Sequence, residues 1–468
     1  MTKPPSAETL AAFAAILGDK GVLTADADKA PYLQEWRGLW HGKTPMVLRP
    51  SSTLQVSEIL KIANAAHCVI VPQSGNTGLV GGQTPNADGS EVVLSLDRMS
   101  KIIEVDTAND TMTVEAGATL KSVQDAAIKA DRMFPLSLAS EGSCHIGGNL
   151  STNAGGLNVL AYGNARELCL GLEVVLADGR ILNGLKKLRK DNTGYDLRNI
   201  FIGAEGTLGI ITAATLKLFP QVKRYDTAFV AVPSPEAALQ LLSNAKQASG
   251  NRLIAFELMA DLCIDFAVRN MKQTRPLQSP WHVLMELADA PEGQLEAILE
   301  NAMAYGLATD AVIAQNDQQR LDFWSLRESI SGSQKPEGGS IKHDVSVPVS
   351  KVPQLIAEAT PAVLKFLPGC RFATFGHMGD GNLHFNVSQP VGMDKQAYLD
   401  KWHAMNEIVH DIVVKLGGSF SAEHGIGTLK RDDMLRYKSA VELDLMRGFK
   451  TLFDPNGILS PGRVIPSV

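Results

Sequence analysis

This chain lacks the sequence features that mark several common classes of protein. None of its apolar runs approaches the ~20 residues that a transmembrane helix needs, and no basic cluster offsets the net charge of −6, which disfavours nucleic acid as a partner. Its five cysteines are scattered without CxxC spacing, so we expect no disulfide framework and no iron–sulfur cluster. The first residues lack a strongly basic lead and favour a helix capped near Ser6 over a signal peptide. These absences favour a cytoplasmic protein.

Two glycine-framed motifs carry the strongest chemical signal. His377 and His384 lie in GHMGDGNLHFN, and Glu423 and His424 lie in SAEHGIG. Two neutral imidazoles and one carboxylate are a common ligand set for catalytic Zn²⁺, because three protein ligands leave one position open for substrate. The pattern predicts that His377, His384 and Glu423 bind zinc or another divalent metal, with His424 as the neighbouring base.

A hairpin would bring the two histidines together. Residues seven apart on one straight strand point to opposite faces, but Gly379, Asp380 and Gly381 are strong turn formers. ATFGH and NLHFNV are therefore predicted as paired strands. The alternative is that these histidines are ordinary polar loop residues, which would be the better interpretation for any one of them alone.

Three glycine-rich stretches point to a different ligand. They are VIVPQSGNTGLVGG at 69–82, the small-residue stretch 137–166, and KDNTGYDLRNIFIGAEGTLGIIT at 190–212. Consecutive backbone N–H groups in the first could close on a pyrophosphate, although its spacing matches neither GxGxxG nor a P-loop, and by itself a plain turn would explain it as well. Together the three suit an extended dinucleotide held by several loops.

These motifs, in this order and with DPNGILSPGR, resemble the flavoproteins of the vanillyl-alcohol oxidase and cresol methylhydroxylase type. Within that family they look like the D-2-hydroxy-acid dehydrogenase branch, and the resemblance is nearly full length. It implies an α+β chain with a two-lobed FAD-binding domain, PCMH-type, and an α+β substrate domain. Some members attach flavin through a histidine in the first loop, but this loop has Asn76 and Thr77 instead, so we expect non-covalent FAD.

The resemblance also assigns residues to the flavin. Those in the first loop are Pro72, Ser74, Gly75, Asn76, Thr77, Gly78, Leu79 and Gly81. Those in the second and third stretches are Ser140, Glu141, Gly142, Gly147, Gly148, Asn149, Thr152, Asn153, Gly155, Gly156, Gly206 and Ile210, and Asn382 is a further candidate.

Substrate residues follow from the same resemblance. In the zinc-dependent 2-hydroxyglutarate enzymes an arginine, a threonine and a lysine bind carboxylates, and these places match Arg327, Ser331 and Lys342. Separately from the resemblance, Asn386 is a candidate to orient substrate or flavin. Serine at 331 departs from threonine but keeps the hydroxyl. Arginine suits a carboxylate because its planar fork donates two parallel hydrogen bonds. The alternative is that Arg327 and Lys342 are solvated surface charges.

The expected reaction is oxidation of a D-2-hydroxy acid. The metal would bind the C1 carboxylate and C2 hydroxyl, His424 would take the hydroxyl proton, and hydride would pass to the flavin. D-2-hydroxyglutarate or D-malate is favoured, with D-lactate second and glycolate third. A non-redox flavoenzyme such as an ether-lipid synthase, or a flavoprotein with a vestigial site, stays open. Electrons would leave to a separate acceptor, either an electron-transfer flavoprotein, a quinone or a cytochrome, and a homodimer is not excluded.

The order of elements predicts the domains. Helical spacing at 54–67 leads into the strand CVIVP, and LEVVLADGRILNG is a predicted hairpin that turns at Asp178-Gly179. The predicted domains are 1–219 for FAD, 220–397 for substrate and metal, and a helical segment 398–468 that returns to the flavin domain. Two strand–helix units after Pro220 predict a sheet with helices on one side, forming a cap over the flavin.

Overall fold

Two compact units make up the part of the chain that the computed structural model describes, residues 3–466. The first unit comprises residues up to Gly156, Gly163–Gln221 and the chain from His424, and the second comprises Leu157–Tyr162 and Val222–Glu423. The predicted boundary after residue 219 lies two residues before the observed one. The predicted boundary at 398 differs from the observed division, because residues 398–423 belong to the second unit.

A small, mostly parallel sheet begins the first unit. Its strand order is β1 (Val22–Leu23), β2 (Val47–Leu48), β4 (Glu91–Ser95) and β3 (Val69–Gln73), and β2, β4 and β3 run parallel. All residues of β4 are buried, which is the usual pattern for a parallel strand covered on both faces. The accompanying helices are α1 (Ala7–Leu17), which Ser6 caps as predicted, α2 (Asp26–Lys29) and α3 (Thr53–Ala65).

An antiparallel sheet of five strands completes this unit. Its order is β5 (Ile102–Asp106), β6 (Thr111–Glu115), β10 (Ile210–Lys217), β8 (Cys169–Val175) and β9 (Ile181–Gly184). The predicted hairpin is confirmed, since β8 and β9 pair across the turn at Gly179, whose φ is 84°. The remaining elements are α4 (Leu120–Lys129), β7 (Arg132–Met133), α5 (Ile146–Ser151), α7 (Arg198–Phe201), β11 (Phe219–Pro220), α15 (Asp433–Tyr437) and α16 (Ala440–Phe453).

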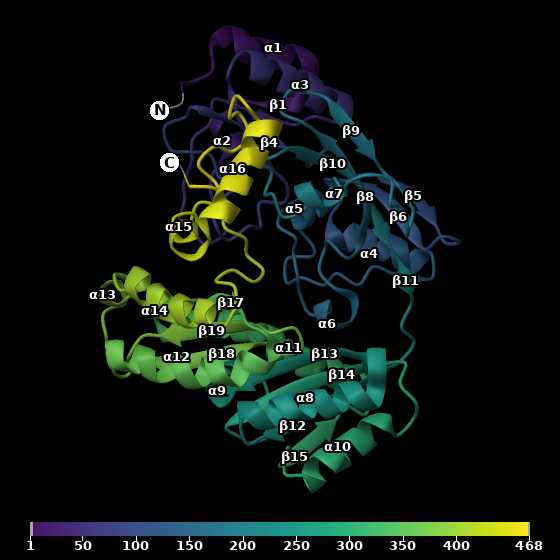
Figure 1. The fold of residues 1–468 in the computed structure, drawn as a ribbon, viewed down its shortest axis with the longest axis vertical. Coiled ribbons are helices and arrows are strands. Elements are labelled where there is room, and N and C mark those ends of the chain that lie inside the picture. The colour runs from purple at the N-terminus through teal and green to yellow at the C-terminus, as the bar shows by residue number, and fades with distance from the viewer. Residues whose placement is uncertain (1–2, 467–468) are drawn as a thin grey trace. The chain divides into compact units, whose positions relative to one another are not determined.

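The second unit is built on one antiparallel sheet of eight strands (Figure 1). The order is β15 (Asp310–Ile313), β12 (Tyr225–Val232), β14 (Trp281–Ala288), β13 (Leu253–Ala260), β18 (Arg371–His377), β19 (Asn382–Ser388) and β16 (Ser340–Ile341), and β17 (Asp344–Ser346) also pairs with β19. The two predicted strand–helix units are present as β12 followed by α8 (Pro235–Ser249) and β14 followed by α10 (Gln294–Ala304).

Helices cover both faces of this sheet, so the prediction of helices on one side is wrong. Phe256 and Leu258 of β13 pack with α8, α10, α12 (Val352–Phe366) and α14 (Trp402–Lys415). Ala255 and Met259 of the same strand pack with α9 (Asp261–Met271) and α11 (Asp317–Ser333). Because successive side chains point to opposite faces and all of β13 is buried, both faces need a cover. The short helices α6 (Val159–Tyr162) and α13 (Lys395–Leu399) also belong to this unit.

No helix among residues 3–466 combines the length and apolar character needed to cross a bilayer.

Candidate functional site

The hairpin predicted to join His377 and His384 is confirmed, and it forms one end of the candidate site. Strands β18 and β19 are antiparallel, and the backbone N–H groups of Asp380 and Gly381 donate to the carbonyl oxygen of His377 at 3.2 and 3.1 Å. Gly381 has a φ of 89°, and a Cβ on it would lie 2.1 Å from the carbonyl oxygen of Val347. Only glycine fits there, so the turn that joins the two histidine strands depends on this residue.

His377 and His384 share one face of the sheet. His384 lies directly opposite Phe375 in the strand register, and His377 is two residues beyond Phe375 on the same strand. Side chains two apart on a strand share a face, and diagonal neighbours across strands are within reach of each other. The two imidazole ring centroids are 5.8 Å apart.

Glu423 lies on the segment that follows α14, and this segment places it beside the two histidines. Asp344 at the start of β17 holds this segment, because its Oδ2 accepts from the backbone N–H of Glu423 at 3.0 Å and its carbonyl oxygen accepts from Ala422 at 3.2 Å. The carboxylate oxygens of Glu423 lie 3.7 Å from Nε2 of His377 and 3.8 Å from Nε2 of His384. The structure thus brings the three predicted metal ligands together within the second unit.

A buried glutamate supports this cluster and was missed in the sequence. Glu257 on β13 lies opposite His377 in the strand register, and its Oε1 accepts from Nδ1 of His377 at 2.7 Å. Its Oε2 accepts from Nε of Arg327 at 2.7 Å, and Nη2 of Arg327 lies 2.6 Å away. A single charged residue within the apolar run LIAFELMA was the signal that could have revealed it.

The charges of these groups are strongly coupled. Burial raises the pKa of Glu257, but the facing His377 and Arg327 outweigh it and lower the value to about 2. Burial lowers the pKa of His377, yet Glu257 raises it to about 9. Burial, with the nearby Asp344 and Asp380 carboxylates, raises the pKa of Glu423. Without a metal ion, this cluster therefore keeps bound protons, and these supply the positive charge that a metal ion would bring.

The donor set fits a divalent metal ion. A hydrogen bond from Nδ1 of His377 to Glu257 fixes the ring so that Nε2 faces Glu423, as is usual for metal-binding histidines. Two imidazole nitrogens and one carboxylate match the three-ligand pattern of catalytic zinc. The arrangement could hold zinc or a similar ion and leave a coordination position for a small anionic ligand.

Four other residues of this unit were predicted to bind substrate or flavin, and their surroundings differ from one another. Asn386 shares the face of His384, and its Nδ2 donates to Gln334 at 3.1 Å. Ser331 is exposed one turn after Arg327 on α11, and Lys342 is half-buried between β16 and β17. Asn382 is buried, and both hydrogens of its amide are used by Asp344 and Val345 of β17. Its predicted flavin contact would therefore have to use the side-chain oxygen.

The three glycine-rich stretches converge within the first unit. A Cβ on Gly75 would lie 2.0 Å from the carbonyl oxygen of Ser143, and a Cβ on Gly206 would lie 2.7 Å from Cγ of Pro72. The first stretch therefore touches both of the others. At these two positions glycine is needed because two loops of the protein approach each other.

The first loop fits an anionic cofactor group. Within residues 3–466, the backbone N–H groups from Ser74 to Leu79 donate no hydrogen bond. Asn76 adopts a φ of 52°, and its Nδ2 donates to Pro31 and Gln34, which holds the loop in this conformation. Successive half-buried N–H groups without acceptors are the requirement for a phosphate-binding nest. The loop therefore suits the pyrophosphate of FAD.

His424 lies where the two units meet along the chain. Glu423 is the last residue of the second unit, and His424 is the first residue of the C-terminal part of the first unit. The adjacent Gly425 and Gly427 have φ values of 80° and 50°. The predicted base is thus joined directly to a predicted metal ligand on one side and to a glycine turn on the other.

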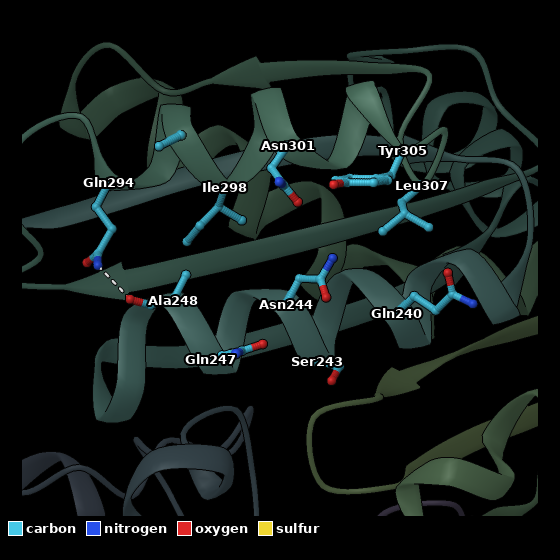
Figure 2. A pocket seen from close by; sticks show the side chains of 11 residues that line it. Gln240, Ser243, Asn244, Gln247, Ala248, Gln294, Ile298, Asn301, Tyr305 and Leu307 are labelled. Carbon is cyan, nitrogen blue, oxygen red and sulfur yellow. Dashed lines mark hydrogen bonds between the residues drawn. The ribbon is translucent and has the colours of Figure 1, made fainter.

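A large groove in the second unit has unsuitable chemistry for this reaction. It lies between α8 and α10, with a volume of about 910 Å³, and is lined mainly by carboxamides such as Gln240, Asn244 and Asn301, with the ring of Tyr305 at one end (Figure 2). Its lining contains no carboxylate, imidazole or ammonium group. We therefore place the candidate site at the histidine cluster.

Comparisons with known proteins agree with the predicted FAD-binding region. A family model described as FAD linked oxidases, C-terminal domain, matches residues 220–464, and a model described as FAD binding domain matches residues 44–184. A protein of Oryza sativa subsp. indica named as a probable mitochondrial D-2-hydroxyglutarate dehydrogenase is 41% identical, over 97% of this chain and 81% of that protein.

Two further relatives differ in their names. A D-2-hydroxyglutarate dehydrogenase of Xanthomonas citri pv. viticola is 36% identical, over 94% of this chain and 93% of that protein. A Schizosaccharomyces pombe protein whose name proposes a mitochondrial D-lactate dehydrogenase is 35% identical, over 98% of this chain and 90% of that protein. The compartment in two of these three names is mitochondrial, so the comparisons do not support the predicted cytoplasmic location.

Solved structures show the same fold at low identity. The p-cresol methylhydroxylase structure superposes with a TM-score of 0.79 at 19% identity, covering all of this chain and 99% of that one. An alkyldihydroxyacetonephosphate synthase superposes with a TM-score of 0.72 at 16% identity, covering 98% and 86%. The predicted fold class, with its FAD-binding domain of vanillyl-alcohol oxidase type, is therefore confirmed.

Proposed function

The chain belongs to the FAD-linked oxidases, and from that premise we propose that it is a metal-assisted dehydrogenase of D-2-hydroxy acids, with D-2-hydroxyglutarate as its preferred substrate. The observation that carries the proposal is the convergence of His377 and His384 on the carboxylate of Glu423, beside the buried guanidinium of Arg327. Such a cluster combines metal ligands with a fixed positive charge, which is the chemistry that a hydroxy carboxylate needs.

The two cofactors would supply the reactive steps. A divalent ion held by His377, His384 and Glu423 would acidify the substrate hydroxyl, and FAD held by the loop 74–79 would accept hydride from C2. His424 would take the hydroxyl proton as general base, a role that suits a histidine at neutral pH.

Arg327 and its neighbours would hold the substrate carboxylate. Glu257 accepts a hydrogen bond from Nε of Arg327, whereas Nη2 lies 2.6 Å from the same carboxylate but donates no hydrogen bond to a described residue. The two Nη groups of Arg327 are therefore the donors that we assign to substrate. Lys342 and Ser331 would add a charge and a hydroxyl. Three cationic or hydroxyl groups in addition to the metal favour a dicarboxylate, which explains our choice of D-2-hydroxyglutarate, with D-malate next.

Electrons would leave the flavin to a separate acceptor. The five cysteines are buried and unpaired, and none belongs to a metal-ligand group among the described residues. An iron–sulfur cluster of thiolate ligands is therefore not expected in this chain. An electron-transfer flavoprotein, a quinone or a cytochrome would complete the catalytic cycle.

Anaerobic flavin reduction tests the proposal. Purified protein with FAD and Zn²⁺ is mixed with D-2-hydroxyglutarate, D-malate, D-lactate or glycolate, and the flavin absorbance is followed. We expect rapid bleaching by D-2-hydroxyglutarate and slow bleaching by the monocarboxylates. Bleaching by none of the four acids would contradict the proposed reaction.

D-lactate is the alternative to the two dicarboxylates, because one relative of 35% identity carries that name. Fast bleaching by D-lactate alone would assign Arg327 to the C1 carboxylate and would leave the metal chemistry unchanged. The non-redox alternative rests on fold likeness to an alkyldihydroxyacetonephosphate synthase at 16% identity, which is evidence for the fold only. A vestigial site would show itself as a protein that binds FAD but no metal.

A further inference from the structure

Glu205 is a strained residue within the third glycine-rich stretch. It lies in GAEGTLGI with a φ of 51°, in the left-handed region that side chains with a Cβ seldom adopt. Such a conformation persists only where surrounding contacts hold it, and it occurs preferentially at functional sites. The backbone N–H of Glu205 donates to Ser151 of the second stretch at 2.8 Å.

The carboxylate of Glu205 fills the inside of the glycine turn that follows His424. Its Oε1 accepts from the backbone N–H of Ile426 at 2.7 Å, and its Oε2 accepts from that of Gly427 at 2.9 Å. A Cβ on Gly425 would lie 2.7 Å from Oε1. A carboxyl group that accepts two backbone hydrogen bonds fixes both the position and the orientation of this turn.

The same turn is also attached to the first glycine loop. Thr428 and Leu429 donate their backbone N–H groups to the carbonyl oxygen of Val80, at 2.9 and 3.1 Å. A Cβ on Gly82 would lie 3.3 Å from Cα of Gly427 and 3.4 Å from Oε2 of Glu205. All of these groups belong to the first unit, so Glu205 connects the glycine stretches to the residues directly after His424.

We propose that Glu205 is a positioning residue that sets the location of His424 relative to the flavin-binding loops. The inference rests on the proposed function, in which His424 is the base and the loop 74–79 binds FAD. Glycine turns have no side chains with which to hold their own conformation. Without an acceptor for Ile426 and Gly427, the chain at His424 would sample several positions, and proton transfer requires one of them.

Glu205→Gln tests this role with little change in shape. One oxygen becomes an NH₂ group, which faces a backbone N–H and cannot accept from it. Asp454→Asn is the control, because Asp454 accepts from the backbone N–H groups of Ile458 and Leu459 at 2.9 and 2.8 Å, outside the turn at His424, and pairs with Lys450. Both variants lose one carboxylate that holds a loop of the first unit.

The measurements use FAD- and Zn²⁺-saturated protein reduced anaerobically by D-2-hydroxyglutarate. For Glu205→Gln we expect flavin reduction to slow about 10- to 100-fold, with the apparent KM within about threefold of wild type. The pH profile of reduction should change, and deuterium exchange of the amides of 425–429 should increase. Asp454→Asn should lower Tm while its folded protein reduces flavin within about twofold of the wild-type rate.

Normal reduction with a normal pH profile in Glu205→Gln would overturn the inference, even if Tm falls. If that variant does not fold, Gly425→Ala is the second variant, because its Cβ would push against Oε1 of Glu205 and disturb the hydrogen bonds to the turn. It must give the same slow reduction. Wild-type protein that no hydroxy acid bleaches would overturn the proposed function and the inference together. A wild type that bleaches beside an equally fast Glu205→Gln would overturn the inference alone.

Discussion

The two predicted ligand-binding regions are built from different parts of the polypeptide. In the second unit, side chains would make the site: His377, His384 and Glu257 lie on β18, β19 and β13, and Glu423 lies on the segment after α14. In the first unit, backbone N–H groups of a loop make the site, and Asn76 uses its side chain to hold that loop. One region would therefore select its ligand through the identity of side chains, and the other through the path of the backbone.

This difference sets what mutations should do. Replacing His377, His384 or Glu423 would remove a ligand, while replacing a side chain of the loop other than Asn76 leaves its N–H groups in place. Only a substitution that moves the backbone should harm the loop. The metal and the flavin should therefore be lost independently, through variants of different kinds.

The largest effect is expected for His384→Ala. Loss of one imidazole should empty the metal site and slow flavin reduction by about 10⁴-fold or more, because the substrate hydroxyl is no longer acidified. FAD content should stay at the wild-type level. His403→Ala, which removes an exposed histidine from α14 of the same unit, is the control. Metal analysis and stopped-flow reduction measure both, and a metal-free variant with normal reduction would contradict the account.

His424→Ala should separate proton transfer from both binding regions. We expect reduction to slow by about 10²–10³-fold, the usual range for a general base, while metal and FAD contents are unchanged. A histidine must be neutral to accept a proton, so we expect the wild-type rate to decline at low pH and this decline to disappear in the variant. Loss of metal together with activity would instead make His424 a ligand.

Glu257→Gln should weaken the metal site without removing a ligand. A carboxamide at 257 cannot hold His377 and Arg327 with the same charge, and changes of this kind typically cost about 10- to 100-fold in metal affinity. Titration of Zn²⁺ into stripped protein measures the change. Unchanged affinity would show that strand geometry alone orients His377.

Gly75→Ala should act on the loop by moving its backbone. The added Cβ would lie 2.0 Å from the carbonyl oxygen of Ser143, so we expect FAD to bind about tenfold more weakly or worse. Zn²⁺ affinity should be unaffected. Gly448→Ala on α16, where a Cβ meets nothing within 4 Å, should leave FAD binding unchanged. Fluorescence titration with FAD distinguishes the two.

The smallest effect concerns stability without metal. The pKa of His377 is about 9 against an ordinary 6.5, so its stabilising contribution is complete below pH 6.5 and is lost as the pH rises through 9. The pKa of Glu257 is about 2 against 4.5, so its contribution is present above pH 4.5 and is lost as the pH falls through 2. We expect chelated protein to lose about 2–4 °C in Tm between pH 7 and 9. An equal loss in Zn²⁺-loaded protein would contradict this origin.

The sequence predicted the parts of the site that depend on local patterns. Glycine turns identified the β18–β19 hairpin, and residue types identified His377, His384 and Glu423. Glu257 lies 120 residues from its partner His377, and only the register between β13 and β18 brings them together. The same limit hid Asp344 and Glu205, which act on backbone groups far along the chain.

Local sequence patterns also could not predict the unit to which residues 398–423 belong. We predicted that residues 398–468 return to the flavin domain as one segment, but α13 and α14 belong to the second unit with its sheet. Burial of α14 against α12 and β16, through residues such as Val409 and Val413, decides this. Helical periodicity reveals that such a face exists and does not reveal which sheet it covers.

The most direct test of the account is a metal titration followed by flavin reduction. FAD-loaded protein is stripped with EDTA, and anaerobic bleaching by D-2-hydroxyglutarate is measured before and after Zn²⁺ is returned in steps. We expect little bleaching without metal, and recovery that is complete at about one Zn²⁺ per chain. Undiminished bleaching of the metal-free protein would contradict the central claim that His377, His384 and Glu423 hold a catalytic metal.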